Sequence, residues 1–279
     1  MDQKALEAVL ADLPLGAVRY YQQLGSTNDE AARWADQGAP ELALVLADEQ
    51  TAGRGRAGRR WFTPPGSALA FSLVLYPTWD EFAYLTRMTS LGALAVCTAL
   101  QYPYSLSAEV KWPNDVLLDR RKVAGVLAEA KWAGERLVSL ILGIGINVAP
   151  PSIPKASPEV EHHFPVTCVE TVLGRPIDRL ELLHYVLAEF LHWRSRLPTP
   201  DFMLAWEANL AFRGEWVQIS PGESQVNDGI SPTVESLHAP VQEGQIVGLA
   251  SDGSLKLRTC SGKVETVQIG EVRLRPAIA

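Results

Sequence analysis

The hydrophobic pattern divides the chain into two parts. Up to about residue 211, apolar runs of strand length alternate with segments whose apolar residues recur at helical spacing. The runs predict strands at 17–24, 42–47 and 68–76, and a β-meander of further strands over 108–148. The helical spacing predicts helices at 4–13, from Ser26 onward, at 82–101, at 178–196 and at 200–211. Because strands and helices do not alternate strictly, the pattern favours an α+β domain over a doubly wound parallel sheet.

From Gly214 the pattern changes to short alternating strands separated by turn signals such as Asp252-Gly253 and Ser261-Gly262. This spacing predicts a small β-barrel of about 65 residues. We therefore expect a large domain over residues 1–212 and a small one over 213–279. Residues 221–240 are expected to form a loop within the small domain.

The first long helix is predicted from its start. Ser26-Thr27-Asn28-Asp29 places a hydroxyl three residues before a carboxylate, which is a capping-box pattern.

Composition excludes several classes of protein. The chain has 279 residues, 47% hydrophobic and 20% charged, as expected of an ordinary soluble globular protein. Its net charge of −7 argues against a general nucleic-acid binder. Cys97, Cys168 and Cys260 are widely spaced, which predicts no disulfide framework and fits a reducing cytosol. No signal peptide and no run of 18 apolar residues is present, so we expect a cytoplasmic protein without a membrane span.

A glycine-rich loop at 53–61 concentrates positive charge in this acidic chain. Its arginines are Arg54, Arg56, Arg59 and Arg60, interspersed with Gly53, Gly55 and Gly58. Guanidinium groups repel one another, and they match phosphate and carboxylate bidentately, so an anion would stabilise the loop. The alternative is a solvated basic surface loop.

A second polar segment runs from Lys111 to Ala130. Pro113 breaks the chain between two predicted strands and leaves Asn114 and Asp115 at a strand end. Lys122 follows across a short hairpin, which should return it close to both side chains. Gly125 suggests that a ligand or another backbone segment approaches this strand closely. The alternative is a turn-capping Asn-Asp pair with a solvated lysine.

The glycines of Leu142–Val148 do not form a dinucleotide fingerprint. A third glycine and a following helix are both missing, so the phosphate-binding helix terminus is absent. Asn147, at the end of a buried strand, could hydrogen-bond a base or ribose, or could be a plain turn asparagine. The sequence also has no Walker loop, no HExxH motif and no GxSxG elbow, and His162 and His163 suit solvent better than a metal.

Together these motifs resemble the biotin protein ligase family. The matching segments are Ser26-Thr27-Asn28, GRGRAGRRW at 53–61, KWPND at 111–115, KVAGVLAE with Lys122, Gly125 and Glu129, and GIGIN at 143–147. The resemblance covers most of the chain from about residue 20, and the pair GRGRxGRxW and KWPND is highly specific. Larger members carry an N-terminal winged helix-turn-helix. Because only about 20 residues precede the first strand, the resemblance implies the monofunctional type without that DNA-binding domain.

The resemblance implies a fold and a reaction. The fold is a mixed sheet with flanking helices, like that of class II aminoacyl-tRNA synthetases, followed by a small SH3-like β-barrel. The reaction uses biotin and MgATP to form biotinyl-5′-AMP. Biotin then passes to a lysine of the biotin carboxyl carrier protein of acetyl-CoA carboxylase. No DNA or membrane partner is implied, and the enzyme would be a monomer or a homodimer paired at a sheet edge.

The resemblance also assigns roles to residues. Catalysis is expected of Lys122, Arg54 and Arg56. Biotin binding is expected of Ser26, Thr27, Asn28, Gln50, Gly53, Arg54, Gly55, Arg56, Lys122 and Gly125. ATP binding is expected of Arg56, Arg59, Trp61, Asn114, Asp115, Lys122 and Asn147. No protein ligand to the metal is assigned, because Mg²⁺ would arrive with ATP; Asp115 either contacts it or orients Lys122.

Three other functions are weaker. A lipoate ligase or octanoyl transferase shares the fold and the acyl chemistry but has different arginine motifs. A DNA-binding repressor lacks its N-terminal domain here and would need a basic surface. A passive biotin binder would not need the phosphate-directed charge of the arginine loop and Lys122.

Overall fold

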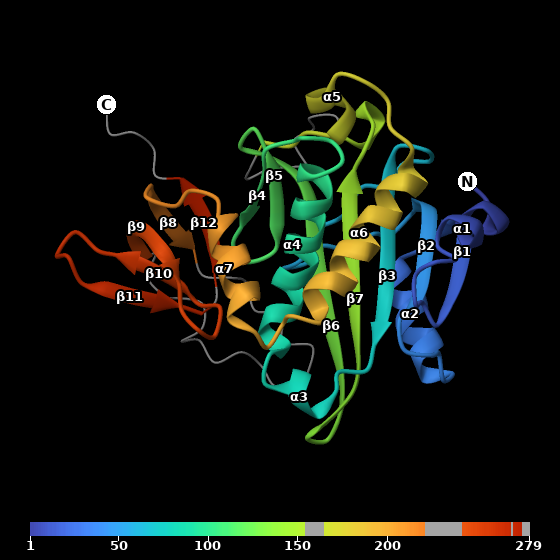
Figure 1. The fold of residues 1–279 in the computed structure, drawn as a ribbon, viewed down its shortest axis with the longest axis horizontal. Helices are drawn as coiled ribbons and strands as arrows, with labels where there is room; N and C mark the ends of the chain where they lie inside the picture. The colour runs from blue at the N-terminus through green and yellow to red at the C-terminus, as the bar shows by residue number, and fades with distance from the viewer. Residues whose placement is uncertain (154–164, 221–241, 269, 275–279) are drawn as a thin grey trace.

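The computed structural model describes residues 1–153, 165–220, 242–268 and 270–274 (Figure 1). The predicted loop at 221–240, and His162 and His163, lie outside the described residues.

A seven-stranded mixed sheet forms the centre of the molecule (Figure 1). Its strands, in spatial order, are β1 (Ala17–Leu24), β2 (Ala43–Gln50), β3 (Ala68–Leu75), β7 (Arg136–Asn147), β6 (Arg121–Ala133), β5 (Asp115–Leu118) and β4 (Ala108–Lys111). β1 and β2 pair in parallel, and the other neighbours are antiparallel. The strand predictions, including the meander over β4–β7, are confirmed, and so is the α+β class.

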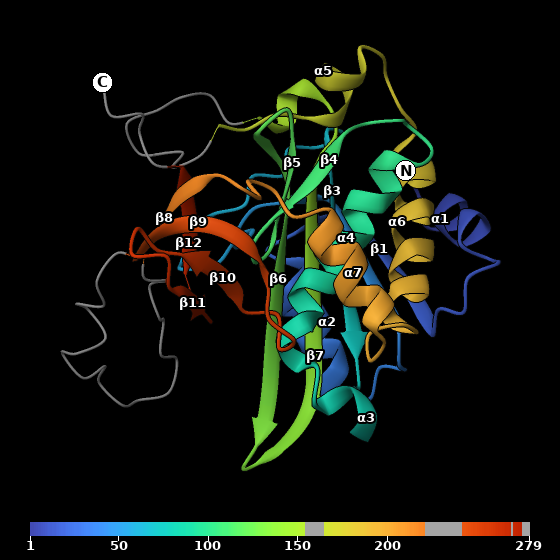
Figure 2. The same ribbon diagram turned by 60° about the vertical axis from the view of Figure 1, so that its left-hand side comes forward.

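Helices cover both faces of this sheet, so its central strands are buried on both sides (Figures 1 and 2). α4 (Met88–Gln101) and α6 (Arg179–Arg194) pack on one face. α2 (Thr27–Asp36) packs on the other, against β2, β3 and β7. Successive residues of β2 enter opposite cores: Leu44 lies in the α4 and α6 core, and Val45 in the α2 core.

The remaining helices are shorter. They are α1 (Gln3–Val9), α3 (Trp79–Phe82), α5 (Val169–Leu173), α7 (Pro200–Ala208) and the 3₁₀ turns η1 (Leu85–Arg87) and η2 (Pro150–Ser152). The helix predicted at 82–101 is confirmed from Met88 onward as α4, but its first part is wrong, because that part of the chain is divided between α3 and η1. Thr78 and Glu81 form a capping box that starts α3, and Tyr84 leaves helical geometry with φ −117° and ψ 15°.

The start of α2 also differs from the prediction. Ser26 is the N-cap residue in extended conformation, but its side chain makes no capping hydrogen bond. The backbone N–H of Thr27 instead donates to Oε1 of Gln50 at 2.8 Å. The Asp29 carboxylate is engaged by Arg54. The predicted capping box is therefore absent because a neighbouring strand supplies the acceptor.

A second, five-stranded antiparallel sheet lies beside the first (Figure 1). Its order is β11 (Val264–Val267), β10 (Leu255–Arg258), β9 (Gln242–Leu249), β8 (Trp216–Ser220) and β12 (Glu271–Leu274). The predicted small C-terminal β-structure is thus present. Val217 and Ile246 of this sheet belong to the same hydrophobic cluster as α4 and α6, so the two sheets share a core.

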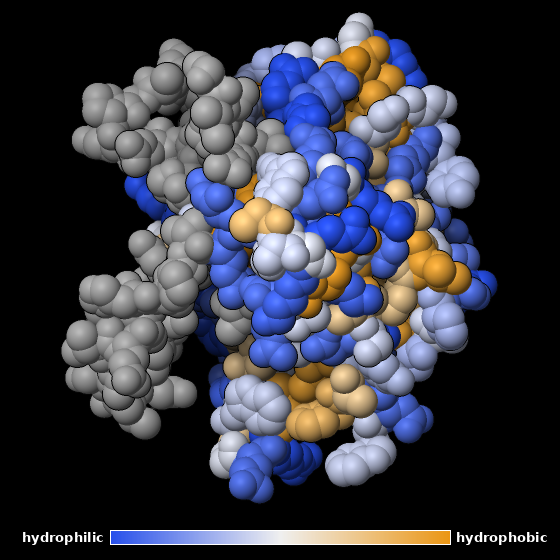
Figure 3. Space-filling view, turned by 90° about the vertical axis from the view of Figure 1, so that its left-hand side faces the viewer, coloured by the Kyte–Doolittle hydropathy of each residue, from blue (hydrophilic) through white to orange (hydrophobic). Residues whose placement is uncertain are grey.

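Among the described residues, no helix is both long and apolar enough to cross a bilayer. The side of the molecule on which the small sheet lies is mostly hydrophilic, with separate apolar patches (Figure 3). The three cysteines are free, and Cys97 and Cys168 are buried.

Candidate active site

One pocket gathers nearly all the predicted site residues. It lies between the start of α2, the arginine loop and the strands β5–β7. Its lining includes Ser26, Thr27, Asn28, Gln50, Arg54, Gly55, Arg56, Arg59, Trp61, Asn114, Asp115, Lys122, Gly125 and Asn147. Gly53 is outside the lining and supports the loop: its carbonyl accepts from Trp61 N at 2.9 Å.

The arginine loop is a small hairpin. Arg54 and Arg60 form an antiparallel bridge, and Gly55 N donates to Arg59 O at 2.6 Å. Ala57 and Gly58 both have positive φ, 55° and 69°, as in the tight turns that join twisted strands. The sequence predicted a flexible loop and missed this hairpin, since alanine is an uncommon residue at such a position.

Within the loop, Arg54 and Arg56 contact different parts of the pocket. Arg54 pairs with Asp29 of α2 and with Glu129 of β6. Nη1 of Arg56 donates to Oδ1 of Asn114 at 2.8 Å. The loop is therefore attached to both ends of the pocket by guanidinium groups.

Two paired glycines form part of the pocket floor. Gly125 of β6 lies directly opposite Gly145 of β7. A Cβ atom added at Gly145 would lie 2.3 Å from the Trp61 ring, and one at Gly125 would lie 3.3 Å from it. The neighbours of Gly125 are the side chains of Lys122, at 3.2 Å from such a Cβ, and Trp61, and not the ligand or backbone segment that the sequence predicted. Gly145 was not predicted as a site residue, although its place in GIGIN was the available signal.

Lys122 lies where the hairpin argument placed it. Its Nζ is 2.7 Å from Oδ1 of Asp115, with which it forms an ion pair, and 5.5 Å from the centre of the Trp61 ring. Nζ of the buried Lys111 lies 3.7 Å from Oδ2 of Asp115. Burial alone would raise the pKa of Asp115, but the charges of Lys122 and Lys111 outweigh it and hold the pKa below its usual value. Asp115 is therefore ionised at neutral pH, and it holds the Lys122 ammonium in place.

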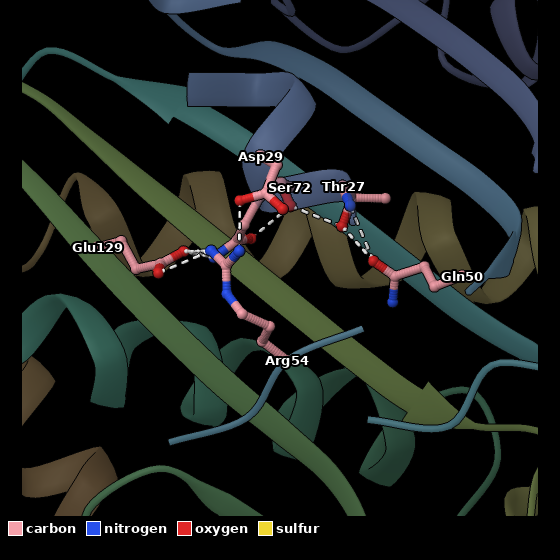
Figure 4. A network of polar contacts seen from close by, with 7 residues as sticks. Thr27, Asp29, Gln50, Arg54, Ser72 and Glu129 are labelled. Carbon is pink, nitrogen blue, oxygen red and sulfur yellow. Dashed lines mark hydrogen bonds and ion pairs between the residues drawn. The ribbon is translucent and has the colours of Figure 1, made fainter. Parts of the chain in front are cut away.

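A chain of uncharged polar groups lies at the opposite end of the pocket, where Thr27, Asn28 and Gln50 line it and the buried Ser72 lies behind them (Figure 4). Oε1 of Gln50 accepts from the hydroxyl of Thr27 at 3.1 Å. Oγ of Ser72 lies 2.8 Å from Oγ1 of Thr27 and 2.6 Å from Oδ1 of Asn28. Nδ2 of Asn28 donates to Glu129 at 2.6 Å. Sequence analysis gave no role to Ser72 or Glu129; a serine inside the apolar run 68–76 was the only signal for Ser72.

Asn147 closes the pocket near Ser152 and Val166. Its Nδ2 donates to the carbonyl of Thr167 at 3.1 Å. In the part of the chain that the structure describes, no three His, Cys, Asp or Glu side chains are grouped as metal ligands.

Gly143 has no space for a side chain, which gives a testable prediction. An added Cβ would lie 2.1 Å from Oδ1 of Asn28, a group already fixed by Ser72 and Glu129. We expect Gly143→Ala to lower the free energy of unfolding by about 1–3 kcal/mol, as overpacking does. Urea denaturation measures this. Gly25→Ala, where no atom lies within 4 Å, is the matched control, and equal stability of the two variants would contradict the prediction.

Three comparisons place the chain among known proteins. The sequence profile of the "Biotin/lipoate A/B protein ligase family" matches residues 20–147. A biotin--[acetyl-CoA-carboxylase] ligase of Paracoccus denitrificans is 35% identical over 224 residues, which is 78% of this chain and 91% of that protein. The bifunctional ligase/repressor BirA of Bacillus subtilis is 35% identical over 173 residues; the match covers 61% of this chain and 51% of the relative.

Solved structures agree with these sequence matches. The biotin protein ligase from Aquifex aeolicus, in complex with biotin and ATP, superposes with a TM-score of 0.73 at 27% identity. The match covers 93% of this chain and 98% of that one. The large mixed sheet, its flanking helices and the small C-terminal sheet are therefore arranged as in this neighbour.

Proposed function

Because the chain belongs to the biotin protein ligases of the biotin/lipoate A/B protein ligase family, we propose that it joins biotin to a carrier protein in an ATP-dependent reaction. The observation that carries the proposal is the division of the pocket. One end offers uncharged donors and acceptors, and the other offers the cations Lys122, Arg56 and Arg59. Biotin has the same division, with a neutral ureido ring at one end and a carboxylate at the other.

The first step is an adenylation. A carboxylate oxygen of biotin attacks the α-phosphorus of MgATP, the bond to the β-phosphate breaks, and pyrophosphate leaves. The products are biotinyl-5′-AMP and pyrophosphate. Because the carboxylate must approach a polyphosphate, the like charges have to be cancelled, and Lys122, Arg54 and Arg56 are placed around the pocket to do so.

The second step is acyl transfer. The neutral ε-amine of a carrier-protein lysine attacks the carbonyl carbon of the mixed anhydride. The bond to the AMP oxygen breaks, AMP leaves, and the attacking nitrogen loses a proton to form the amide. The protein's contribution to both steps is mainly to position the reactants.

We assign the two ends of the pocket as follows. The biotin end comprises Ser26, Thr27, Asn28, Gln50, Gly53, Arg54, Gly55 and Gly125. The nucleotide end comprises Arg59, Trp61, Asn114, Asp115 and Asn147. Arg56 and Lys122 lie between them and serve both substrates. The contact between Arg56 and Asn114 at 2.8 Å supports the role of Arg56 toward the nucleotide.

Mg²⁺ is a substrate component that accompanies ATP. Of the two roles considered for Asp115, the geometry supports orienting Lys122, because its carboxylate is already neutralised by two lysines. A carboxylate in that position is a poor additional ligand for a divalent cation.

The acceptor proposed is the biotin carboxyl carrier protein of acetyl-CoA carboxylase, and the compartment the cytoplasm, where ATP and free thiols are maintained. We further propose that the catalytic unit ends near residue 212 and that the enzyme acts as a monomer or a homodimer.

A transfer assay tests the proposal. The enzyme is incubated with biotin, MgATP and a purified biotin carrier domain, and the carrier is followed by intact mass. We expect the mass of one biotinyl group to be added only when ATP is present. Parallel reactions use lipoate and octanoate with a lipoyl carrier domain. Labelling by those acids in place of biotin would refute the proposal.

A further inference from the structure

Glu129 joins two parts of the pocket that are far apart in the sequence. It lies on β6, and its Oε2 accepts from Nδ2 of Asn28 at 2.6 Å. Both of its carboxylate oxygens lie 2.9 Å from Nη2 of Arg54. Nη1 of the same guanidinium donates to Asp29, which follows Asn28 on α2 (Figure 4). We call the set Asn28, Asp29, Arg54 and Glu129 the Glu129 bridge.

The charge of Glu129 determines how Asn28 is turned. An ionised carboxylate only accepts hydrogen bonds, so the amide NH₂ group of Asn28 has to face it. Oδ1 of Asn28 then faces Ser72, whose buried hydroxyl lies 2.6 Å away. The Ser72 hydroxyl has a single proton, which this orientation directs to Asn28, while Thr27 donates its own proton to Gln50. The orientation set by Glu129 therefore extends through Asn28 to Ser72.

The same carboxylate holds one strand of the arginine hairpin. Arg54 begins the bridge to Arg60, and its side chain spans two carboxylates from separate elements. The exposed fractions of the side chains are 41% for Arg54, 41% for Glu129 and 48% for Asp29. At such exposure each ion pair is weak and is screened by salt, so the attachment of the hairpin is reversible.

We propose that Glu129 is a positioning residue that couples the uncharged end of the pocket to the arginine hairpin. It orients Asn28 and, through Arg54, holds the hairpin over the biotin end. This inference rests on the proposed function for its ligand, but the bridge itself is a property of the protein without ligand. Asn28 acts in it as a connector, since both ends of its amide are engaged by Ser72 and Glu129.

Trypsin provides a direct test, because the hairpin contains four arginines and no proline follows any of them. Arg54, Arg59 and Arg60 are exposed, but cleavage requires the hairpin to open locally into an extended segment that fits the protease. We expect Glu129→Gln to raise the rate of cleavage within 54–60 by about three- to fivefold, as the loss of weak exposed ion pairs predicts. Fragment masses identify the site. Asp29→Asn should give a smaller increase, because it leaves the contacts of Glu129 with both Arg54 and Asn28 in place.

Glu135→Gln is the matched control. It removes the same charge from an exposed residue in the turn after β6. Raising the salt concentration screens the ion pairs of Arg54, so the wild-type cleavage rate should rise towards that of Glu129→Gln. The rate of Glu135→Gln, measured at the same salt concentrations, is used to correct for other effects of salt. Equal rates for Glu129→Gln and Glu135→Gln at low salt would overturn the proposal, whether or not the protein is a biotin ligase.

A kinetic measurement separates positioning from catalysis. If the wild type transfers biotin, Glu129→Gln should raise KM for biotin about three- to fivefold and leave kcat nearly unchanged, because an open hairpin competes with binding. A fall in kcat with an unchanged KM would contradict the positioning role. Failure of the wild type to transfer biotin would refute the proposed function. The proteolysis result would still show whether the Glu129 bridge holds the hairpin.

Discussion

Lys122→Ala is expected to lower the rate of biotin transfer at least about a hundredfold, the effect typical of removing a preorganised group that stabilises developing charge. Nζ of Lys122 is held 2.7 Å from Asp115 and faces the Trp61 ring inside the pocket. In the proposed reaction the Lys122 ammonium lies between the biotin carboxylate and the α-phosphate. Water that enters after the substitution would not supply the fixed positive charge that is lost. Formation of the adenylate, measured as pyrophosphate release, should fall as strongly as transfer.

The control for this experiment is Lys131→Ala. Lys131 belongs to the same strand but is exposed and pairs with Asp36 of α2. Thermal unfolding should show that Lys122→Ala is still folded, since only one partner of Asp115 is lost and Lys111 remains. Transfer by Lys122→Ala at the wild-type rate would keep the ligase assignment and remove Lys122 from its proposed role.

Arg56→Gly is expected to increase the release of free biotinyl-5′-AMP by about tenfold to a hundredfold, which is the range for loss of a charged hydrogen bond. Arg56 connects the hairpin turn to Asn114 at the nucleotide end. Without that connection, water reaches the mixed anhydride and the intermediate leaves before the carrier lysine attacks. Chromatography of free adenylate, with the carrier omitted, measures the release.

Arg60→Gly is the control for the loss of charge and the added backbone freedom. Arg60 lies in the same hairpin. Its guanidinium donates to the carbonyl of Thr51, whereas that of Arg56 donates to Asn114. We expect it to release less adenylate than Arg56→Gly. Equal retention of the adenylate by Arg56→Gly and the wild type would show that the contact between Arg56 and Asn114 does not retain the intermediate.

Local patterns predicted the sheet well, because the apolar runs at β2, β3 and β7 are buried on both faces and have few alternative structures. They also predicted that Asn114, Asp115 and Lys122 line one pocket, because a short hairpin returns the second strand alongside the first. Helix boundaries were less reliable. Ser26 failed to cap α2 because Gln50, 23 residues away from Thr27, supplied the acceptor.

The residues that sequence analysis missed act across long separations. Ser72 meets Asn28 at a separation of 44 residues, and Asn28 meets Glu129 at a separation of 101. No local pattern encodes such a contact, since it depends on how two strands and a helix pack in three dimensions. The arginine hairpin was missed for the opposite reason: its turn is local, but its first turn residue is the alanine Ala57, which rarely adopts that conformation.

The glycine floor also limits how the enzyme could be redesigned for larger acids or labelled analogues. At Gly125 and Gly145 the floor consists of main chain alone, so no truncation there can enlarge the pocket, and any substitution would reduce it. The Trp61 ring lies against both glycines, so space at this part of the floor would have to come from that ring and not from the main chain. A library intended to enlarge this part of the pocket should therefore vary residue 61 and leave both glycines unchanged.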